Sequence, residues 1–297
     1  MSPFGFITAY DDHYLRYGVW YSQKETRQGS IILLVGRREF MEKYAETIGE
    51  LNERGFDVYS FDWRGQGLSS RMLTSRHKGF IDNYGTYVDD LDLFIKKIVQ
   101  PDAVIPLFIL AHSMGGHIAL RFIHDHPEIA HKTVLVSPMI DILTPTIPKR
   151  IVRFMVKSAV KLGFKRAYTI GSGDYNPAEK FESNQRTSDP ERFMNEKKAI
   201  AKNRDLALGG VTYGWLSATF ESIDMLAEPG FAEKVTIPIL IVGAGDDKIV
   251  SIDAQKTICR RLKNSSFIEI AGARHEILKE TDHIRSIFWD FFDRFTK

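Results

Sequence analysis

The feature that most constrains this chain is a serine placed between a strand-like run and a helix-like run. Residues 106–110 form a continuous apolar run, and residues 118–123 repeat apolar side chains at helical spacing. Ser113 lies between them, with Ala111 and Gly115 two positions to either side. Small residues at these positions let a strand and a helix approach closely, which predicts a sharp turn that exposes the Ser113 hydroxyl. The competing interpretation is an ordinary helix N-cap, where serine is also favoured.

Strand-like and helix-like segments alternate along most of the chain, which predicts an α/β fold with a mostly parallel, doubly wound sheet. The runs expected to form buried strands are 30–36, 56–62, 106–112, 132–137, 237–243 and 266–270. Helical patterns occupy residues 40–55, 84–99, 114–126, 252–262 and 281–296. An aromatic-rich, alternating stretch at 5–22 predicts an antiparallel hairpin at the edge of the sheet.

The alternation stops between residues 140 and 232, where helical patterns and turn residues occur without a convincing buried strand. We therefore divide the chain into a first core part at 1–139, a helical insertion at 140–232 and a second core part at 233–297. Ligands of open α/β sheets bind at the carboxyl ends of the strands. The insertion begins at that end, so we expect it to lie over Ser113 as a lid.

A serine hydroxyl is a weak nucleophile at neutral pH and needs a base that a carboxylate orients. Of the nine histidines, only His275 follows a late predicted strand. The loop after the preceding predicted strand offers Asp246 and Asp247. We favour Asp247 because the apolar pair 249–250 would anchor the loop, although both aspartates could instead cap the next helix. The chain order of Ser113, Asp247 and His275 is that of a hydrolase catalytic triad.

Two backbone N–H groups are candidates for the oxyanion hole that such a triad requires. The first is the N–H of Met114, directly after the serine. The second is the N–H of Arg37, which follows Gly36 in the loop after the first buried strand. The single cysteine precludes an internal disulfide and a cysteine-based metal cluster. We expect no metal and no cofactor.

Composition narrows the choice of partners and location. The formal net charge is +2 over 297 residues, which gives no global case for nucleic-acid binding. No apolar run is long enough for a membrane-spanning helix, and the N-terminus lacks the pattern of a secretory signal. We therefore expect a cytoplasmic protein. The sequence carries no signal for oligomeric state.

Five stretches give the chain a resemblance to the α/β-hydrolase superfamily, and more closely to the bacterial lysophospholipases and the monoacylglycerol lipases related to them. They are residues 36–40, 62–69, 87–91, 111–116 and 208–215. The last, Leu-Gly-Gly-Val-Thr-Tyr-Gly-Trp, is the narrowest and favours the lysophospholipase branch. The superfamily often has His-Gly before the oxyanion loop, whereas this chain has Val35 and Gly36. The resemblance implies hydrolysis of one acyl ester through an acyl-enzyme, without a metal or cofactor.

Two features of the insertion bear on the substrate. Residues 149–166 contain many cations and no acid, with apolar side chains at helical spacing at Ile151, Val152, Met155, Ala159 and Leu162. Such a helix either lies on an anionic membrane or packs its apolar stripe on the core and leaves a solvated basic face. Other apolar residues either line an acyl groove or form the core of the lid, namely Tyr213, Trp215, Leu216 and Phe220.

These observations predict a lysophospholipase-like serine hydrolase that cleaves the ester of a one-chain lipid through an acyl-enzyme on Ser113. A monoacylglycerol lipase and a general carboxylesterase are the alternatives among enzymes, since fold alone does not separate them. The alternative among proteins that are not enzymes is a catalytically silent, hydrolase-like lipid-binding module. The complete triad argues against this alternative. The basic segment 149–166 would make peripheral contact with the inner face of the membrane.

Overall fold

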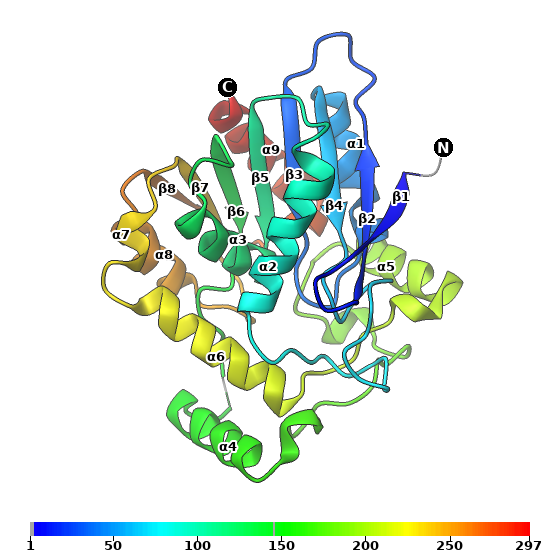
Figure 1. Ribbon diagram of the computed structural model, residues 1–297, viewed down its shortest axis with the longest axis vertical. Coiled ribbons are helices and arrows are strands. Elements are labelled where there is room, and N and C mark those ends of the chain that lie inside the picture. The colour runs from blue at the N-terminus through cyan, green and yellow to red at the C-terminus, as the bar shows by residue number, and fades with distance from the viewer. Residues whose placement is uncertain (1–2, 145) are drawn as a thin grey trace.

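The computed structural model describes residues 3–144 and 146–297, and these contain an eight-stranded sheet in the order β1-β2-β4-β3-β5-β6-β7-β8 (Figure 1). The strands are β1 (Phe4–Thr8), β2 (Tyr14–Trp20), β3 (Gly29–Leu34), β4 (Phe56–Phe61), β5 (Leu107–His112), β6 (Lys132–Val136), β7 (Ile239–Ala244) and β8 (Ser265–Ile270). The pairs β1–β2 and β2–β4 are antiparallel, and the other pairs are parallel. The predicted edge hairpin and the parallel sheet are therefore both confirmed.

Helices cover both faces of this sheet, which explains the continuous apolar runs in its central strands. The helices are α1 (Ala45–Glu53), α2 (Gly85–Phe94), α3 (Met114–Asp125), α8 (Ile252–Arg261) and α9 (Asp282–Thr296). Short helical segments accompany them at η1 (Met41–Tyr44), η2 (Ile95–Val99) and η6 (Ile277–Lys279). Figure 1 shows α2 and α3 on one face and α1 and α9 on the other. Strands β3, β4, β5 and β7 are buried along their whole length.

The segment between β6 and β7 is helical, as the sequence predicts for residues 140–232. Its elements are α4 (Lys149–Lys161), η3 (Phe164–Arg166), η4 (Phe181–Ser183), α5 (Pro190–Lys202), η5 (Arg204–Leu206), α6 (Tyr213–Ala227) and α7 (Phe231–Lys234). Helices α4, α5 and α6 lie toward the lower end of the sheet in Figure 1. Among residues 3–144 and 146–297, no helix has the length and apolar character needed to cross a bilayer.

Helix α6 is part of the main hydrophobic core. Its residues Trp215 and Leu226 belong to the same buried cluster as the central strands. Two polar contacts add to this packing. The Ser222 hydroxyl lies 2.6 Å from Nε2 of His117 on α3, and the Thr219 hydroxyl lies 3.0 Å from the hydroxyl of Tyr84. Helix α6 is therefore fixed to the core around the sheet along its length.

Helix α4 packs on α6, and the side chains that it buries differ from the predicted stripe. Val156 is the buried residue of α4 and packs against Phe220 and Ile223 of α6. Two members of the predicted stripe, Ile151 and Leu162, are 43% and 73% exposed. Of the two alternatives left open by the sequence, packing of the apolar stripe on the core does not hold for these two residues, because the main partner of α4 among the described residues is helix α6. Only a narrow row of its side chains is covered.

Candidate active site

The sharp turn predicted around Ser113 joins β5 directly to α3. Ser113 has a φ of 51° and a ψ of −115°, a conformation that L-residues rarely adopt. A Cβ atom at Gly115 would lie 2.5 Å from the backbone oxygen of Leu34, so that position has no room for a larger residue. The Cβ of Ala111 is fully buried at the other small position. An alanine in place of glycine at position 111 is therefore compatible with the turn.

The structure brings together the three residues proposed as a triad from the sequence. His275 follows β8, and its Nε2 lies 2.9 Å from the Ser113 Oγ, at a distance for the hydroxyl to donate a hydrogen bond. On the other side of the ring, Nδ1 lies 2.7 Å from the Oδ2 of Asp247, which follows β7. Asp246 is exposed, and among the described residues its side chain forms no hydrogen bond or ion pair with His275. Of the two aspartates, Asp247 is therefore the one that contacts His275.

Asp247 is held by its own loop. Its Oδ1 accepts hydrogen bonds from the N–H groups of Ile249 and Val250, at 2.8 and 3.0 Å. Burial alone would raise the pKa of the Asp247 carboxyl, but the hydrogen bond and charge of His275, with these two N–H groups, lower the pKa below its ordinary value. The carboxylate is thus ionised at neutral pH and can stabilise a protonated His275.

The two oxyanion donors proposed from the sequence have N–H groups that are free to bind a ligand. Met114 is the first residue of α3, so its N–H has no acceptor within the helix. The N–H of Arg37, in the loop after β3, donates to no acceptor in the described part of the chain. Both residues flank the carboxyl ends of β5 and β3, which are neighbours in the sheet.

The loop that carries Arg37 is braced by two side chains that sequence reasoning missed. The N–H of Gly36 donates to a carboxylate oxygen of Glu39. Gln66 donates from Nε2 to the backbone oxygen of Gly36 at 2.7 Å, and its Oε1 accepts from the N–H of Arg38 at 3.2 Å. These contacts fix the loop although a His-Gly pair is absent from it. Glu39 stands in the sequence as one of several charged loop residues, so its role becomes visible only when its partners are known.

Glu39 also connects this loop to the strand that carries the serine. Its carboxylate accepts a hydrogen bond from Tyr44 at 2.6 Å, pairs with Lys43 at 3.0 Å, and lies 3.1 Å from Nδ1 of His112. Burial alone would raise the pKa of Glu39, but the charges of Lys43 and His112 lower it well below its usual range. Burial alone would lower the pKa of His112, and Glu39 raises it above its ordinary value. We infer a buried ion pair that fixes the loop beneath the serine.

A cavity of about 300 Å³ opens over Ser113 and His275. Of the four residues proposed to line an acyl groove, the structure places Trp215 in its wall. Tyr213, Leu216 and Phe220 lie instead in the contact between α6 and α4. The apolar wall comes from residues that the sequence did not single out as lining, namely Met139, Ile142, Leu143, Val211, Ile249 and Val250.

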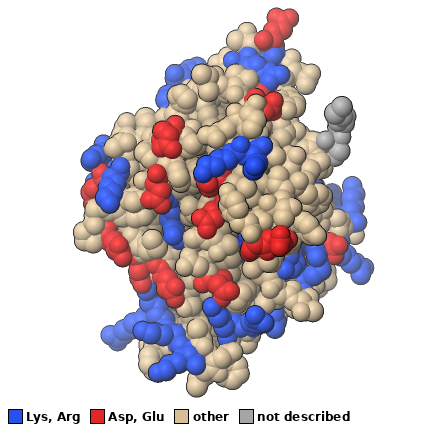
Figure 2. All heavy atoms as spheres, in the orientation of Figure 1, with Lys and Arg blue, Asp and Glu red and all other residues tan. Residues whose placement is uncertain are grey.

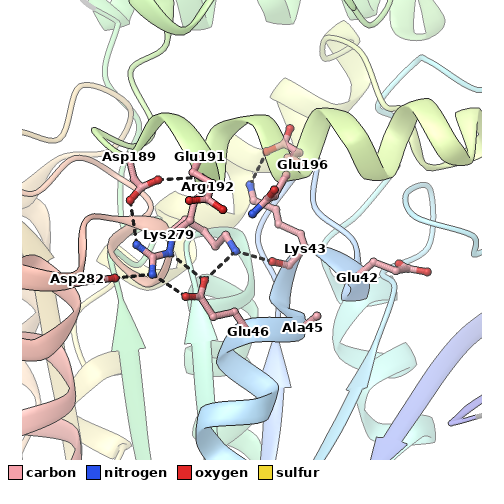
Figure 3. A pocket seen from close by; sticks show the side chains of 11 residues that line it. Glu42, Lys43, Ala45, Glu46, Asp189, Glu191, Arg192, Glu196, Lys279 and Asp282 are labelled. Carbon is pink, nitrogen blue, oxygen red and sulfur yellow. Dashed lines mark hydrogen bonds and ion pairs between the residues drawn. The ribbon is translucent and has the colours of Figure 1, made fainter.

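A second cavity, of about 530 Å³, lies between α1 and α5 and is lined mainly by charged side chains (Figure 3). Arg192 of α5 lies at its centre and pairs with Glu46 at 2.6 Å, with Asp282 at 2.6 Å and with Asp189 at 2.9 Å. Lys279 donates to the backbone oxygen of Lys43 at 2.9 Å. The pairs that Arg192 forms with Glu46 and Asp282 join α5 to α1 and α9.

Comparison with known proteins agrees with this architecture. The family model for serine aminopeptidase, S33, matches residues 25–282. Lysophospholipase L2 of Escherichia coli (strain K12) is 31% identical over 304 residues, covering 97% of this chain and 86% of its own length. Probable lysophospholipase L2 of Haemophilus influenzae is 34% identical over 257 residues, covering 86% of this chain and 79% of its own.

A solved structure shows the same fold at lower sequence identity. It is a soluble variant of monoglyceride lipase from Saccharomyces cerevisiae in complex with a substrate analogue. It superposes with a TM-score of 0.78 at 20% identity, and the match covers 100% of this chain and 96% of that one. The resemblance noted from the five sequence stretches is thus confirmed. The chain belongs to the serine aminopeptidase S33 family of α/β hydrolases.

Proposed function

We propose that this protein is a carboxylic ester hydrolase that releases the fatty acid from a one-chain lipid, with a lysophospholipid as the preferred substrate. The observation that carries the proposal is the line of contacts from Ser113 through His275 to Asp247 at the floor of a cavity with an apolar wall. A serine, a base and an orienting carboxylate in this geometry form the arrangement that performs acyl transfer. The relatives named as lysophospholipases support the choice of substrate.

The first half of the proposed reaction acylates the enzyme. The Ser113 Oγ attacks the ester carbonyl carbon while His275 Nε2 takes the hydroxyl proton, and Asp247 stabilises the resulting imidazolium. The N–H groups of Arg37 and Met114 stabilise the negative oxygen of the tetrahedral intermediate. The intermediate collapses as the C–O bond to the glycerol breaks. His275 then gives its proton to the departing alkoxide, and the fatty acid remains on Ser113.

The second half releases the fatty acid. A water molecule gives a proton to His275 Nε2 and attacks the acyl carbon, and the same two N–H groups stabilise the second tetrahedral intermediate. The bond to Ser113 Oγ breaks, and the serine recovers its proton from His275. The products are a free fatty acid and a glycerophosphodiester. Each of the proposed residues returns to its starting state.

The direct test compares fatty-acid release from a lysophospholipid and from a monoacylglycerol of the same acyl chain, using the intact protein and Ser113→Ala in parallel. We expect faster release from the lysophospholipid, and a loss of at least about 10⁴-fold in Ser113→Ala. Preference for the monoacylglycerol would assign the enzyme to neutral lipids, and preference for short-chain esters would make it a general carboxylesterase. Failure of an organophosphonate to label Ser113 would favour a silent lipid-binding module.

We further propose that the outer surface of α4 contacts an anionic membrane from which the substrate enters, at the inner face of the cell membrane. Phe154, Leu162 and Phe164 are 71%, 73% and 56% exposed. Exposed cations accompany them, among them Lys157 and Lys161, and Figure 2 shows Lys and Arg gathered at the end of the molecule where α4 lies. Apolar side chains together with cations suit the boundary of an anionic bilayer.

Vesicle sedimentation tests this contact. We expect the protein to bind phosphatidylglycerol vesicles more than phosphatidylcholine vesicles, with less binding at high salt. The double substitution Phe154→Ser and Leu162→Ser should abolish most of the binding. Tyr10→Ser is the matched control, because Tyr10 is 77% exposed and lies in the turn between β1 and β2. Equal binding to both vesicles, or equal loss in the control, would contradict the proposal.

A further inference from the structure

Arg37 differs from the other charged residues that line the Ser113 cavity. Arg186 pairs with Glu196 at 2.9 Å, and Arg38 lies 3.5 Å from Glu179. The cavity's two glutamates, Glu39 and Glu276, each pair with Lys43, at 3.0 and 2.7 Å. In contrast, no carboxylate oxygen of the described residues lies within 4.0 Å of the guanidinium nitrogens of Arg37. Arg37 is thus a cation of the cavity wall that has no carboxylate partner among residues 3–144 and 146–297.

The Arg37 guanidinium is held in place by groups without charge. Its Nη2 donates to the backbone oxygen of Gly209 at 2.7 Å, and its central carbon lies 5.1 Å from the centre of the Trp215 ring. A Cβ atom at Gly79 would lie 2.7 Å from Nη2, so a residue without a side chain leaves room for the guanidinium. The Nε of Arg37 is shielded from solvent and has no hydrogen-bond partner in the described part of the chain. At least one donor of this cation is therefore unsatisfied.

This environment disfavours the charge of Arg37 but does not remove it. Desolvation by burial lowers the pKa of the guanidinium to about 10. The side chain therefore remains a cation at neutral pH. A poorly solvated cation without a counter-ion gains free energy when an anion binds, and a guanidinium matches the oxygens of a phosphate group in shape as well as charge.

The position of Arg37 relates this cation to the reacting ester. The backbone N–H of the same residue is the proposed oxyanion donor. In Arg37, the backbone nitrogen and the guanidinium carbon are separated by a certain number of covalent bonds. In a 1-acyl lysophospholipid, the ester carbonyl carbon and the phosphorus atom are separated by the same number. Arg37 therefore has the length to contact the carbonyl oxygen with its backbone N–H and the phosphate with its side chain.

We propose that the Arg37 side chain binds the phosphate of the lysophospholipid head group and so selects phospholipids over neutral monoacylglycerols. This inference rests on the proposed function. It assigns Arg37 a role in specificity that is separate from the role of its backbone N–H. Trp215 and the Gly209 carbonyl act as positioning groups, because they hold the guanidinium at the cavity wall.

Arg71 is a matched control for Arg37, because it is another shielded arginine that contacts the segment 205–209. Its Nη2 donates to the backbone oxygen of Asp205 at 2.8 Å, its Nε and Nη1 have no partner among the described residues, and desolvation lowers its pKa to about 10. Arg71 is absent from the wall of the Ser113 cavity. Its replacement therefore disturbs a similar contact with the segment 205–209 without removing a charge from the active site.

The experiment measures kcat/KM for a 1-acyl lysophosphatidylglycerol and for the matching monoacylglycerol in the intact protein, Arg37→Met, Arg37→Lys and Arg71→Met. We expect Arg37→Met to lower the ratio of kcat/KM for the lysophosphatidylglycerol to kcat/KM for the monoacylglycerol about 10- to 100-fold. The reason is that the charge-assisted contact to the phosphate of the lysophosphatidylglycerol is lost. Arg37→Lys should restore part of the ratio, and Arg71→Met should leave it unchanged. A ratio unaffected in Arg37→Met, or equally lowered in Arg71→Met, would overturn the assignment.

An inhibition assay separates binding of the phosphate from catalysis. We expect glycerol 3-phosphate to inhibit hydrolysis of a neutral ester by the intact protein more strongly than glycerol does, and to lose this advantage in Arg37→Met. Equal inhibition by glycerol 3-phosphate in both proteins would contradict the inference. If the intact protein released fatty acid from neither lipid in a Ser113-dependent manner, the proposed function itself would be wrong. Ser113-dependent release with an unchanged substrate ratio would contradict only the role of Arg37.

Discussion

His112 Nε2 lies 3.2 Å from the backbone oxygen of His275, so the residue before the candidate nucleophile supports the loop that carries the candidate base. The other ring nitrogen of His112 lies 3.1 Å from Glu39, whose carboxylate also accepts from the N–H of Gly36. A single buried path thus joins the oxyanion loop, the serine turn and the histidine loop. We expect the positions of these three loops to depend on one another.

Glu39→Gln tests this dependence. The substitution removes the charge that pairs with His112 and Lys43 and weakens the brace on the Gly36 N–H. We expect kcat to fall roughly 10- to 100-fold with a smaller change in KM, because misplacing catalytic groups slows the chemical step more than it weakens binding. Steady-state kinetics on one lipid ester measures the effect. Glu179→Gln is the control, and a normal kcat in Glu39→Gln would show that the three loops are positioned independently.

Asp247→Asn tests the identity of the triad acid. An amide at this position leaves the size of the side chain intact but no longer stabilises the protonated form of His275. We expect a loss of about 10⁴-fold in kcat, similar to that caused by the same change in a serine protease triad. Asp246→Asn should retain activity because Asp246 is exposed and has no hydrogen bond to His275 among the described residues. The reverse result would transfer the role to Asp246.

The contact between α1 and α5 predicts a pH-dependent contribution to stability. The hydrogen bond from Arg192 lowers the pKa of Glu46 from 4.5 to about 2 in the folded protein. The carboxylate therefore stabilises the fold fully above pH 4.5, and this contribution is lost as the pH falls toward 2.

Glu46→Gln should accordingly lower the free energy of unfolding by about 1 kcal/mol at neutral pH. The difference from the intact protein should shrink below the ordinary pKa of a glutamate, as measured by urea denaturation over a pH series. Glu53→Gln is the matched control, because Glu53 is an exposed glutamate of the same helix. A pH-independent difference would indicate that the contribution of Glu46 is one of packing and not of charge.

Two glycine substitutions should have opposite effects. Gly115→Ala places a Cβ atom 2.5 Å from the Leu34 backbone oxygen, and we expect a loss of about 2 kcal/mol in stability, together with lower activity. Gly49→Ala, in the middle of α1, meets no atom within 4 Å and should stabilise the protein by about 0.5–1 kcal/mol. Thermal and urea unfolding measure both changes. Equal effects of the two substitutions would contradict the steric explanation.

The sheet and the order of the site residues could be predicted because each leaves a local signal. A parallel strand covered on both faces is mostly apolar, as in residues 31–34, and the turn around Ser113 requires small residues at fixed positions. The parallel pairing then brings the loops after β5, β7 and β8 to one edge of the sheet. For this reason Ser113, Asp247 and His275 could be expected to meet although they are distant in the sequence.

The lining of the cavity and the support of the oxyanion loop leave no such signal. Helical spacing identifies which residues of α6 share a face, but it does not tell whether the sheet, another helix or the cavity covers that face. Tyr213 and Phe220 are therefore found against α4, while Trp215 reaches the cavity. Glu39 acquires its role from His112 and Tyr44, which only the folded chain places beside it.

The separate attachment of α4 and α6 has an evolutionary consequence. Helix α6 shares its buried side chains with the sheet, so a mutation on its inner face changes the stability of the whole enzyme. Helix α4 rests on α6 through a narrow row of residues, and most of its surface is unconstrained by packing. Substitutions on the outer surface of α4 can thus change how the protein binds a surface without disturbing the packing of the catalytic core.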